Sequence, residues 1–241
     1  AGIHTFFNGP ESFTPDDAYH LGLAPEMDNV WVAAGFNSVG IQSAGGAGMA
    51  LAQWMEDGQK PFDLGDVDIS RMHPFQGNKT YLFERSKETL GLLYADHFPF
   101  RQMETARGIR RTPFHQQLQE KGAVFGEVAG WERANWFAKD GDDTSEESTQ
   151  TWNREGPWFQ RIKEECLAVR DAAGILDLPG FSRYRLKGEG AAEFLRGLCT
   201  GGIPKIGRMG LVYISDDKGR IVTEMSAMRI DEDFFFMITA G

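Results

Sequence analysis

The chain has 241 residues, 41% of them hydrophobic, and a formal net charge of −10. A chain of this length can bury more than one core, and its pI near 5.0 argues against a nucleic acid or an anionic membrane as partner, because both attract clustered Lys and Arg. Two distant cysteines, Cys166 and Cys199, and five dispersed histidines predict neither a disulfide framework nor a metal site. No apolar stretch is long enough for a membrane span, so we expect a soluble protein of a reducing compartment.

In the first block, residues 1–69, a short β-rich segment precedes apolar residues at helical spacing. We expect a strand at Asn29–Gly35, a helix that includes Met49–Met55, and a glycine-rich turn over residues 36–48 between them. Because glycine lacks a Cβ, such a turn lets a flat ligand lie against backbone N–H groups beside a helix N-terminus. The alternative is that the glycines only let the helix cross close to the sheet. The turn lacks a GxGxxG pattern, which excludes a Rossmann fingerprint.

The second block, residues 70–128, is expected to contain two helices. They are predicted at Tyr81–Asp96 and at Pro113–Lys121, the second with Thr112 as its cap. His97 follows the first helix, and we expect it to have a hydrogen-bonded packing role, the alternative being that it shapes a ligand channel.

The third block, residues 129–241, begins with the aromatic string "GWERANWF", in which we expect Trp131, Trp136 and Phe137 to form a domain-interface core, the alternative being a stacking site for a ligand. An acidic polar loop and a helix at Trp158–Ala173 follow. The pattern then changes to a strand at "RYRLKG", a short helix at Ala191–Leu198 and three strands joined by tight polar turns. The chain is therefore expected to have a mixed α+β fold and, since both ends are abrupt, to be an internal fragment of a longer protein.

Several long strings in the chain point to one family. They include "NGPESFTPD", "VAAGFNSVGI", "YADHFPFRQ", "GAVFGEVAGWERANWF" and "GILDLPGFSRYRLKG". In this order they resemble the sarcosine dehydrogenase and dimethylglycine dehydrogenase family. The resemblance implies three domains: the C-terminal end of a D-amino-acid-oxidase-type FAD domain at 1–69, a small central domain at 70–128, and the start of an aminomethyltransferase-like T-protein domain that binds folate at 129–241.

The same resemblance implies FAD and tetrahydrofolate as cofactors. FAD would oxidise the N-methyl group of sarcosine or dimethylglycine, and tetrahydrofolate would capture the one-carbon unit. Electrons would pass to an acceptor such as an electron-transfer flavoprotein, in the bacterial cytoplasm or the mitochondrial matrix and not outside the cell. The residues implied to contact flavin are Gly35, Phe36, Asn37, Ser38, Val39, Gly40 and Ile41. No catalytic base is assigned in this chain, because the resemblance implies that the family's substrate-side residues and its flavin linkage lie upstream of Ala1.

For folate, the resemblance places Glu224, Met225 and Ser226 at the position that faces the pterin. A carboxylate suits that position, because it can accept paired N–H bonds from an aminopyrimidine edge. The alternative is that Glu224 is an outward-facing strand residue, since alternation alone leaves open which face is buried.

Two other functions stay open. The regulatory subunit of pyruvate dehydrogenase phosphatase has similar "NGPESFTP" and "AAGFNSVGI" strings, which would make the protein a non-catalytic interaction partner. A folate-dependent demethylase without flavin chemistry is the second alternative, and the flavin-side block argues against it.

Overall fold

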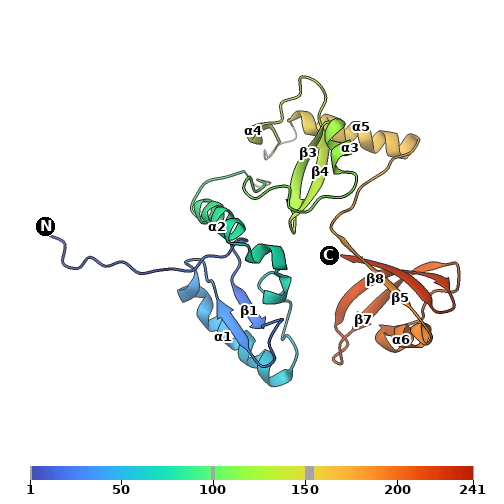
Figure 1. The fold of residues 1–241 in the computed structure, drawn as a ribbon, viewed down its shortest axis with the longest axis horizontal. Helices are drawn as coiled ribbons and strands as arrows, with labels where there is room; N and C mark the ends of the chain where they lie inside the picture. Colours follow the sequence, from blue (N-terminus) through green and yellow to red (C-terminus); the bar gives the residue numbers. More distant parts are fainter. Residues whose placement is uncertain (1, 99–100, 150–154, 241) are drawn as a thin grey trace. The chain divides into compact units, whose positions relative to one another are not determined.

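The computed structural model describes residues 2–98, 101–149 and 155–240 (Figure 1). The chain divides into two compact units, which are described separately below. The first contains Ala1–Arg107 and Asp143–Gly156, and the second contains Gly108–Asp142 and Pro157–Gly241. Both units combine helices with antiparallel strands, which confirms the predicted mixed α+β class.

The first unit is built around a hairpin and one long helix. Strands β1 (His20–Leu23) and β2 (Trp31–Ala34) pair antiparallel, and helix α1 (Gly40–Asp57) lies alongside them (Figure 1). The core between them contains Leu21, Ala47, Ala50 and Leu64. The remaining elements of this unit are the 3-10 turns η1 (Ile69–Arg71) and η2 (Pro74–Gly77) and the helices α2 (Lys79–Leu93) and α4 (Glu146–Thr149).

The glycine-rich turn is much shorter than predicted. The helix begins at Gly40, so that only residues 35–39 connect it to β2, and the expected turn over residues 36–48 is wrong. Alanines between the glycines favour the helix, which ends only where Gly58 takes a left-handed conformation with φ of 67°. The alternative interpretation is wrong as well. Gly45 and Gly46 are exposed and a Cβ there would meet nothing within 4 Å, whereas the alanines make the close contact with the hairpin.

A second hairpin opens the second unit. Strands β3 (Ala123–Val128) and β4 (Trp131–Phe137) pair across a turn in which Ala129 and Gly130 have φ of 48° and 77°. Such a two-residue turn with positive φ suits the twist of a hairpin. Trp136 is buried, as expected for the aromatic string. The predicted division at residues 128 and 129 falls in this turn and would separate one strand of the hairpin from the other.

Two helices accompany this hairpin, α3 (His115–Glu120) and α5 (Pro157–Asp171). They confirm the predicted helices at Pro113–Lys121 and Trp158–Ala173 to within two residues at each end, and α2 in the first unit confirms the helix at Tyr81–Asp96 to within three. The predicted cap Thr112 is wrong, because Phe114 is the N-cap of α3 and its side chain makes no capping hydrogen bond.

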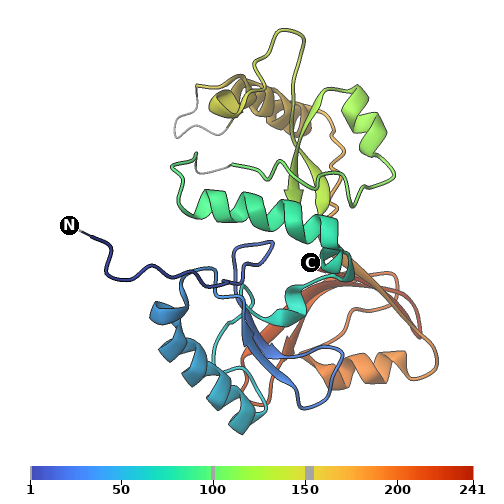
Figure 2. The ribbon, with the colours of Figure 1, turned by 60° about the vertical axis from the view of Figure 1, so that its left-hand side comes forward.

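The rest of the second unit is a five-stranded antiparallel sheet with one helix. The strand order is β5-β9-β8-β7-β6, and α6 (Ala191–Leu198) has the predicted bounds. Figures 1 and 2 show α6 lying along one face of the sheet, where Leu195, Val212, Ala227 and Phe235 form the centre of the core. The strands are β5 (Phe181–Lys187), β6 (Cys199–Thr200), β7 (Met209–Ser215), β8 (Ile221–Asp231) and β9 (Phe234–Ala240).

Among the described residues, no helix combines the length and the apolar character that crossing a membrane requires.

Candidate functional site

The turn that joins β2 to α1 is held in an unusual backbone conformation. Gly35, Asn37 and Ser38 have φ of 68°, 48° and 63°. A Cβ at Gly35 would lie 2.6 Å from Cγ2 of Thr14, so both the conformation and the close approach require glycine there. Asparagine is among the side chains that tolerate positive φ best.

Asn37 fixes this turn to the segment before β1. Its side chain is buried, its Oδ1 accepts the backbone N–H of Thr14 at 2.7 Å, and its Nδ2 donates to Thr14 Oγ1 at 2.9 Å and to the carbonyl of Gly35 at 2.8 Å. Asn37 was predicted to contact flavin, but the structure turns its side chain into the protein. Its role here is to hold the turn in place.

The remaining predicted flavin residues divide into two groups. The Phe36 ring stacks on Tyr19, with centroids 4.7 Å apart, and belongs to the first unit's core. Ser38 and Ile41 are exposed, Val39 is the half-buried N-cap of α1, and Gly40 is the first residue of the helix. No described side chain caps this helix and no acidic residue lies in its first turn, so its N-terminal N–H groups keep their partial positive charge. The turn therefore presents backbone donors outward.

His20 lies next to this turn and was not singled out from the sequence. It pairs with Ala34 across the hairpin, and a Cβ at Gly35 would be 3.6 Å from its Cδ2. Burial and the Arg71 guanidinium lower the pKa of His20, and the opposing effect of Asp16 is smaller. The lowered pKa favours the neutral imidazole. Its buried Nδ1 has no hydrogen-bond partner among the residues that the structure describes.

The three residues predicted for folate do not share a face. On β8, Met225 is buried in the core beneath α6, whereas Glu224 and Ser226 project from the opposite face, which we call the open face of the sheet. Met225 therefore cannot contact a ligand that meets Glu224. The alternation of side chains along a strand requires this separation, so the prediction that all three consecutive residues face the pterin is wrong for Met225.

Glu224 is exposed and lies opposite Tyr213 of β7. Its backbone carbonyl accepts hydrogen bonds from the Thr239 hydroxyl at 2.8 Å and from the Thr223 hydroxyl at 3.3 Å, contacts that anchor the strand and leave the carboxylate on the open face. The structure thus supports the outward-facing alternative for its orientation, and that orientation is also the one a ligand on the open face needs.

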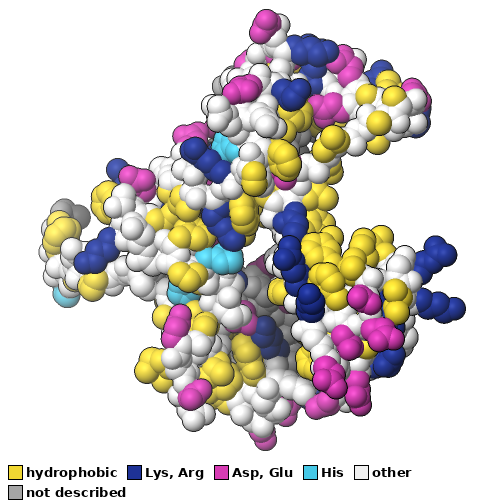
Figure 3. Space-filling model, turned by 45° about the vertical axis from the view of Figure 1, so that its right-hand side comes forward, with side chains coloured by type: hydrophobic (Ala, Val, Ile, Leu, Met, Phe, Trp, Pro, Cys, Tyr) yellow, Lys and Arg dark blue, Asp and Glu magenta, His cyan; other side chains and the backbone are white. Residues whose placement is uncertain are grey.

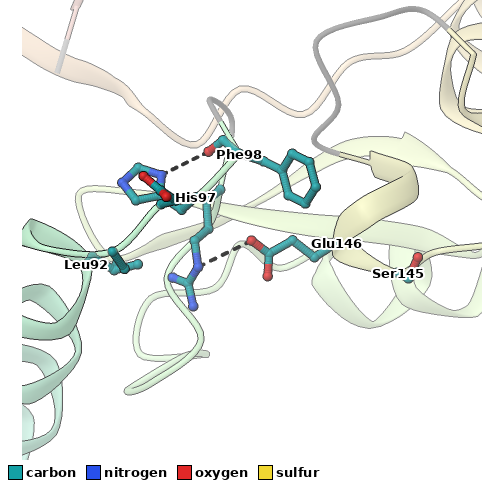
Figure 4. A pocket seen from close by; sticks show the side chains of 8 residues that line it. Leu92, His97, Phe98, Ser145 and Glu146 are labelled. Carbon is teal, nitrogen blue, oxygen red and sulfur yellow. Dashed lines mark hydrogen bonds and ion pairs between the residues drawn. The ribbon is translucent and has the colours of Figure 1, made fainter.

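A pocket of 790 Å³ in the first unit offers a different arrangement of polar groups (Figure 4). It is lined by His97, Phe98, Arg101 and Glu146 among others. His97 is exposed and its Nδ1 lies 3.1 Å from the carbonyl of Phe98, while Arg101 forms ion pairs with Glu88, Glu104 and Glu146 at 3.1–3.5 Å. The Arg101 guanidinium is thus already paired with three carboxylates, which leaves it little capacity to bind an anionic ligand.

The described residues contain no group of three or more His, Cys, Asp or Glu side chains placed to hold a metal ion.

Comparison with family models gives two matches that together cover most of the chain. Residues 57–112 match the FAD dependent oxidoreductase central domain, and residues 114–241 match the GCVT N-terminal domain. The two matched ranges meet at residues 112–114, close to the division of the structure at residues 107 and 108.

Three of the relatives are, by name, oxidases or dehydrogenases of N-methylated amino acids. A 4-methylaminobutanoate oxidase (formaldehyde-forming) from Paenarthrobacter nicotinovorans is 41% identical over 99% of this chain and 29% of its own length. Mitochondrial dimethylglycine dehydrogenase from Rattus norvegicus is 30% identical over 100% of this chain and 28% of its own. Mitochondrial sarcosine dehydrogenase from Homo sapiens is 34% identical over 78% of this chain and 23% of its own length.

The mitochondrial regulatory subunit of pyruvate dehydrogenase phosphatase from Mus musculus is also similar, with 29% identity over 96% of this chain and 27% of its own length. The chain spans less than a third of the length of each of these relatives. Because the GCVT N-terminal domain matches more than half of the chain, the chain belongs to that domain family, with an FAD dependent oxidoreductase central domain directly before it. The predicted resemblance is confirmed, since sarcosine dehydrogenase and dimethylglycine dehydrogenase are among its relatives.

Proposed function

We propose that the protein containing this chain oxidatively demethylates sarcosine or dimethylglycine with FAD and transfers the one-carbon unit to tetrahydrofolate. The observation that carries the proposal is the order of two domains in one chain, an FAD oxidoreductase central domain followed directly by a GCVT N-terminal domain. The substrates named for the relatives differ, but each is an N-methyl amine that also bears a carboxylate.

On the flavin side, the geometry of the turn fits the proposed cofactor. FAD, when bound, supplies hydride acceptance from the N-methyl carbon. The chain would contribute the backbone of residues 38–41 and the uncapped N-terminus of α1, whose partial positive charge stabilises negative charge nearby. Gly35 and Asn37 would keep those backbone groups in place.

On the folate side, Glu224 would accept N–H bonds from the pterin edge, with Ser226 beside it on the same face. The name of the 41% identical relative specifies formaldehyde as product, so the fate of the one-carbon unit is the point of the proposal that most needs a test. Transfer to an electron-transfer flavoprotein and a location in the bacterial cytoplasm or mitochondrial matrix also belong to the proposal.

The test uses Glu224→Gln in the full-length protein. The substitution keeps the shape of the side chain but replaces one acceptor by a donor that would face another donor. We expect tetrahydrofolate affinity to fall about ten- to a hundredfold, from a mismatch of about 1–3 kcal/mol. Dye-linked oxidation of sarcosine and dimethylglycine should continue, with more free formaldehyde released.

The matched control is Glu193→Gln, an exposed glutamate of α6 on the other side of the sheet, which should change neither measurement. Unchanged folate affinity in Glu224→Gln would remove Glu224 from the site. A parallel loss of amine oxidation would mean that Glu224 supports the fold instead.

The non-catalytic alternative is favoured by the similarity to the phosphatase regulatory subunit. Purified full-length protein decides between them: bound flavin absorbance that bleaches on addition of sarcosine or dimethylglycine supports the enzyme, and a protein without flavin supports the regulatory function.

A further inference from the structure

The open face of the sheet arranges its side chains in rows that the strand register defines. A row consists of the residues that lie opposite one another on neighbouring strands. The first row contains Tyr213 of β7 and Glu224 of β8. The next two rows cross β7, β8, β9 and β5 in that order. One consists of Leu211, Ser226, Ile238 and Arg183, and the other of Met209, Met228, Phe236 and Arg185. A last, partial row consists of Phe234 of β9 and Lys187 of β5. The face thus has a carboxylate in one corner and cations along the opposite edge strand.

Between the carboxylate and the cations the open face is apolar. We call Leu211, Met228, Phe236 and Ile238 the apolar lane. Leu211 is 57% exposed and Met228 is 38% exposed, although the other face of the same sheet is covered by α6. Figure 3 shows hydrophobic side chains and basic side chains next to one another on the surface of this unit.

The three cations of β5 differ in how they are engaged. Arg183 donates to the carbonyls of Leu178 and Phe181 at 2.8 Å and 3.1 Å, and the Nζ of Lys187 lies 5.4 Å from the centre of the Phe234 ring. Arg185 is exposed, and its side chain makes no hydrogen bond or ion pair with the residues that the structure describes. It is therefore the cation that is available to an anion from outside.

The spacing between Glu224 and Arg185 follows from sheet geometry. They are two strands apart, and their rows are separated by four residues along the strands. With a strand spacing of about 4.8 Å and a rise of about 3.4 Å per residue, the two Cα positions are roughly 17 Å apart across the apolar lane.

We propose that Arg185, with Lys187 beyond it, binds the carboxylate end of the folate whose pterin meets Glu224. The inference rests on the proposed function and extends it. Tetrahydrofolate carries an N–H-rich pterin, an aromatic ring and a glutamate tail in that order, and the open face offers a carboxylate, an apolar lane and a cation in the same order. Glu224 repels the anionic tail and Arg185 attracts it, so the ligand has one favoured direction on the sheet.

The experiment compares two ligands on full-length protein. Affinities for tetrahydrofolate and for 6-methyltetrahydropterin, which lacks the aromatic ring and the tail, are measured on the parent, on Arg185→Gln and on Arg196→Gln. Arg196 is an exposed cation of α6 on the covered side of the sheet and serves as the matched control. We expect Arg185→Gln to weaken tetrahydrofolate binding about two- to fivefold and to leave binding of the pterin unchanged. Added salt should reduce the preference of the parent for tetrahydrofolate.

Tetrahydrofolate affinity that is unchanged in Arg185→Gln, with pterin binding intact, would overturn the inference and leave the folate proposal standing. An equal loss for both ligands would assign Arg185 a structural role and overturn the inference too. If the parent binds neither ligand, the folate half of the proposed function falls and the inference falls with it.

Discussion

Asn37 shows how a residue of the candidate flavin turn acts through the backbone. Asn37→Ala would leave the buried N–H of Thr14 without its acceptor. It would also place alanine at φ of 48°, where the hydrogen bond from the Asn37 side chain to the Gly35 carbonyl no longer supports the turn. We expect a loss of stability of about 2–4 kcal/mol and, in full-length protein, a loss of bound flavin. Thermal unfolding and the visible spectrum measure the two effects. Ser38→Ala, at an exposed neighbour with similar φ, is the control, and equal stability of the two variants would contradict the assigned role.

Glu88 gives the first unit a pH dependence. Burial raises the pKa of its carboxyl, but hydrogen bonds from the Thr105 hydroxyl, from the backbone N–H groups of Glu104 and Thr105 and from Arg101 outweigh it and lower the pKa to about 2. A carboxyl with a lowered folded-state pKa stabilises the protein above its unfolded pKa, and this contribution is lost as the pH falls toward 2.

We therefore expect the stability of the first unit to fall by at most about 3 kcal/mol between pH 5 and pH 2 through this group. In Glu88→Gln the part of the pH dependence that comes from this carboxyl should vanish, and the first unit should be less stable than in the parent at pH 7. Urea unfolding at several pH values measures it. Glu84→Gln, one turn earlier on α2 and exposed, should retain the full dependence, and a parental pH profile in Glu88→Gln would exclude Glu88 as its source.

Among the elements, those with a clear period were predictable from the sequence and those marked by glycine were not. The bounds of α6 and the meander of β7, β8 and β9 follow from periodicity and polar turns. The glycines before Met49 predict a turn, but α1 begins at Gly40, because the helix propensity cost of glycine is small enough for the packing of Ala47 and Ala50 to override it. The face on which Glu224 lies was not predictable, since α6 decides it by covering Met225.

Helix α1 provides a test of the flavin proposal that separates ligand contact from folding. A Cβ at Gly40 would lie 3.4 Å from Cβ of Phe36, an ordinary contact, so Gly40→Val should change stability by less than about 0.5 kcal/mol. If flavin lies against this turn, the same variant of the full-length protein should lose most of its flavin absorbance. Gly91→Val on α2, where a Cβ meets nothing within 4 Å, is the control. A folded Gly40→Val protein with normal flavin content would contradict the placement of flavin against this turn.

For the whole molecule, the main observation is that each unit has its own core. One cluster contains Leu21 with Ala47, Ala50 and Leu64, and the other contains Leu195 with residues of β7, β8 and β9. Neither cluster includes a residue of the other unit. The two domain models meet near one of the divisions between the units, although residues 143–156 belong to the first unit and lie inside the GCVT match. This organisation predicts that damage to one core stays within its unit.

Leu195→Ala and Leu21→Ala test that prediction. Both side chains are 1% exposed, so each truncation should destabilise its own unit by about 2–5 kcal/mol. Hydrogen exchange measured by mass spectrometry on the chain should show faster exchange in β7, β8 and β9 for Leu195→Ala and in β1, β2 and α1 for Leu21→Ala, with the other unit unchanged in each case. Leu198→Ala, on the same helix but 40% exposed, should have a much smaller effect than Leu195→Ala. If either core substitution speeds exchange equally in both units, the two cores unfold as one, and the division into independent units is wrong.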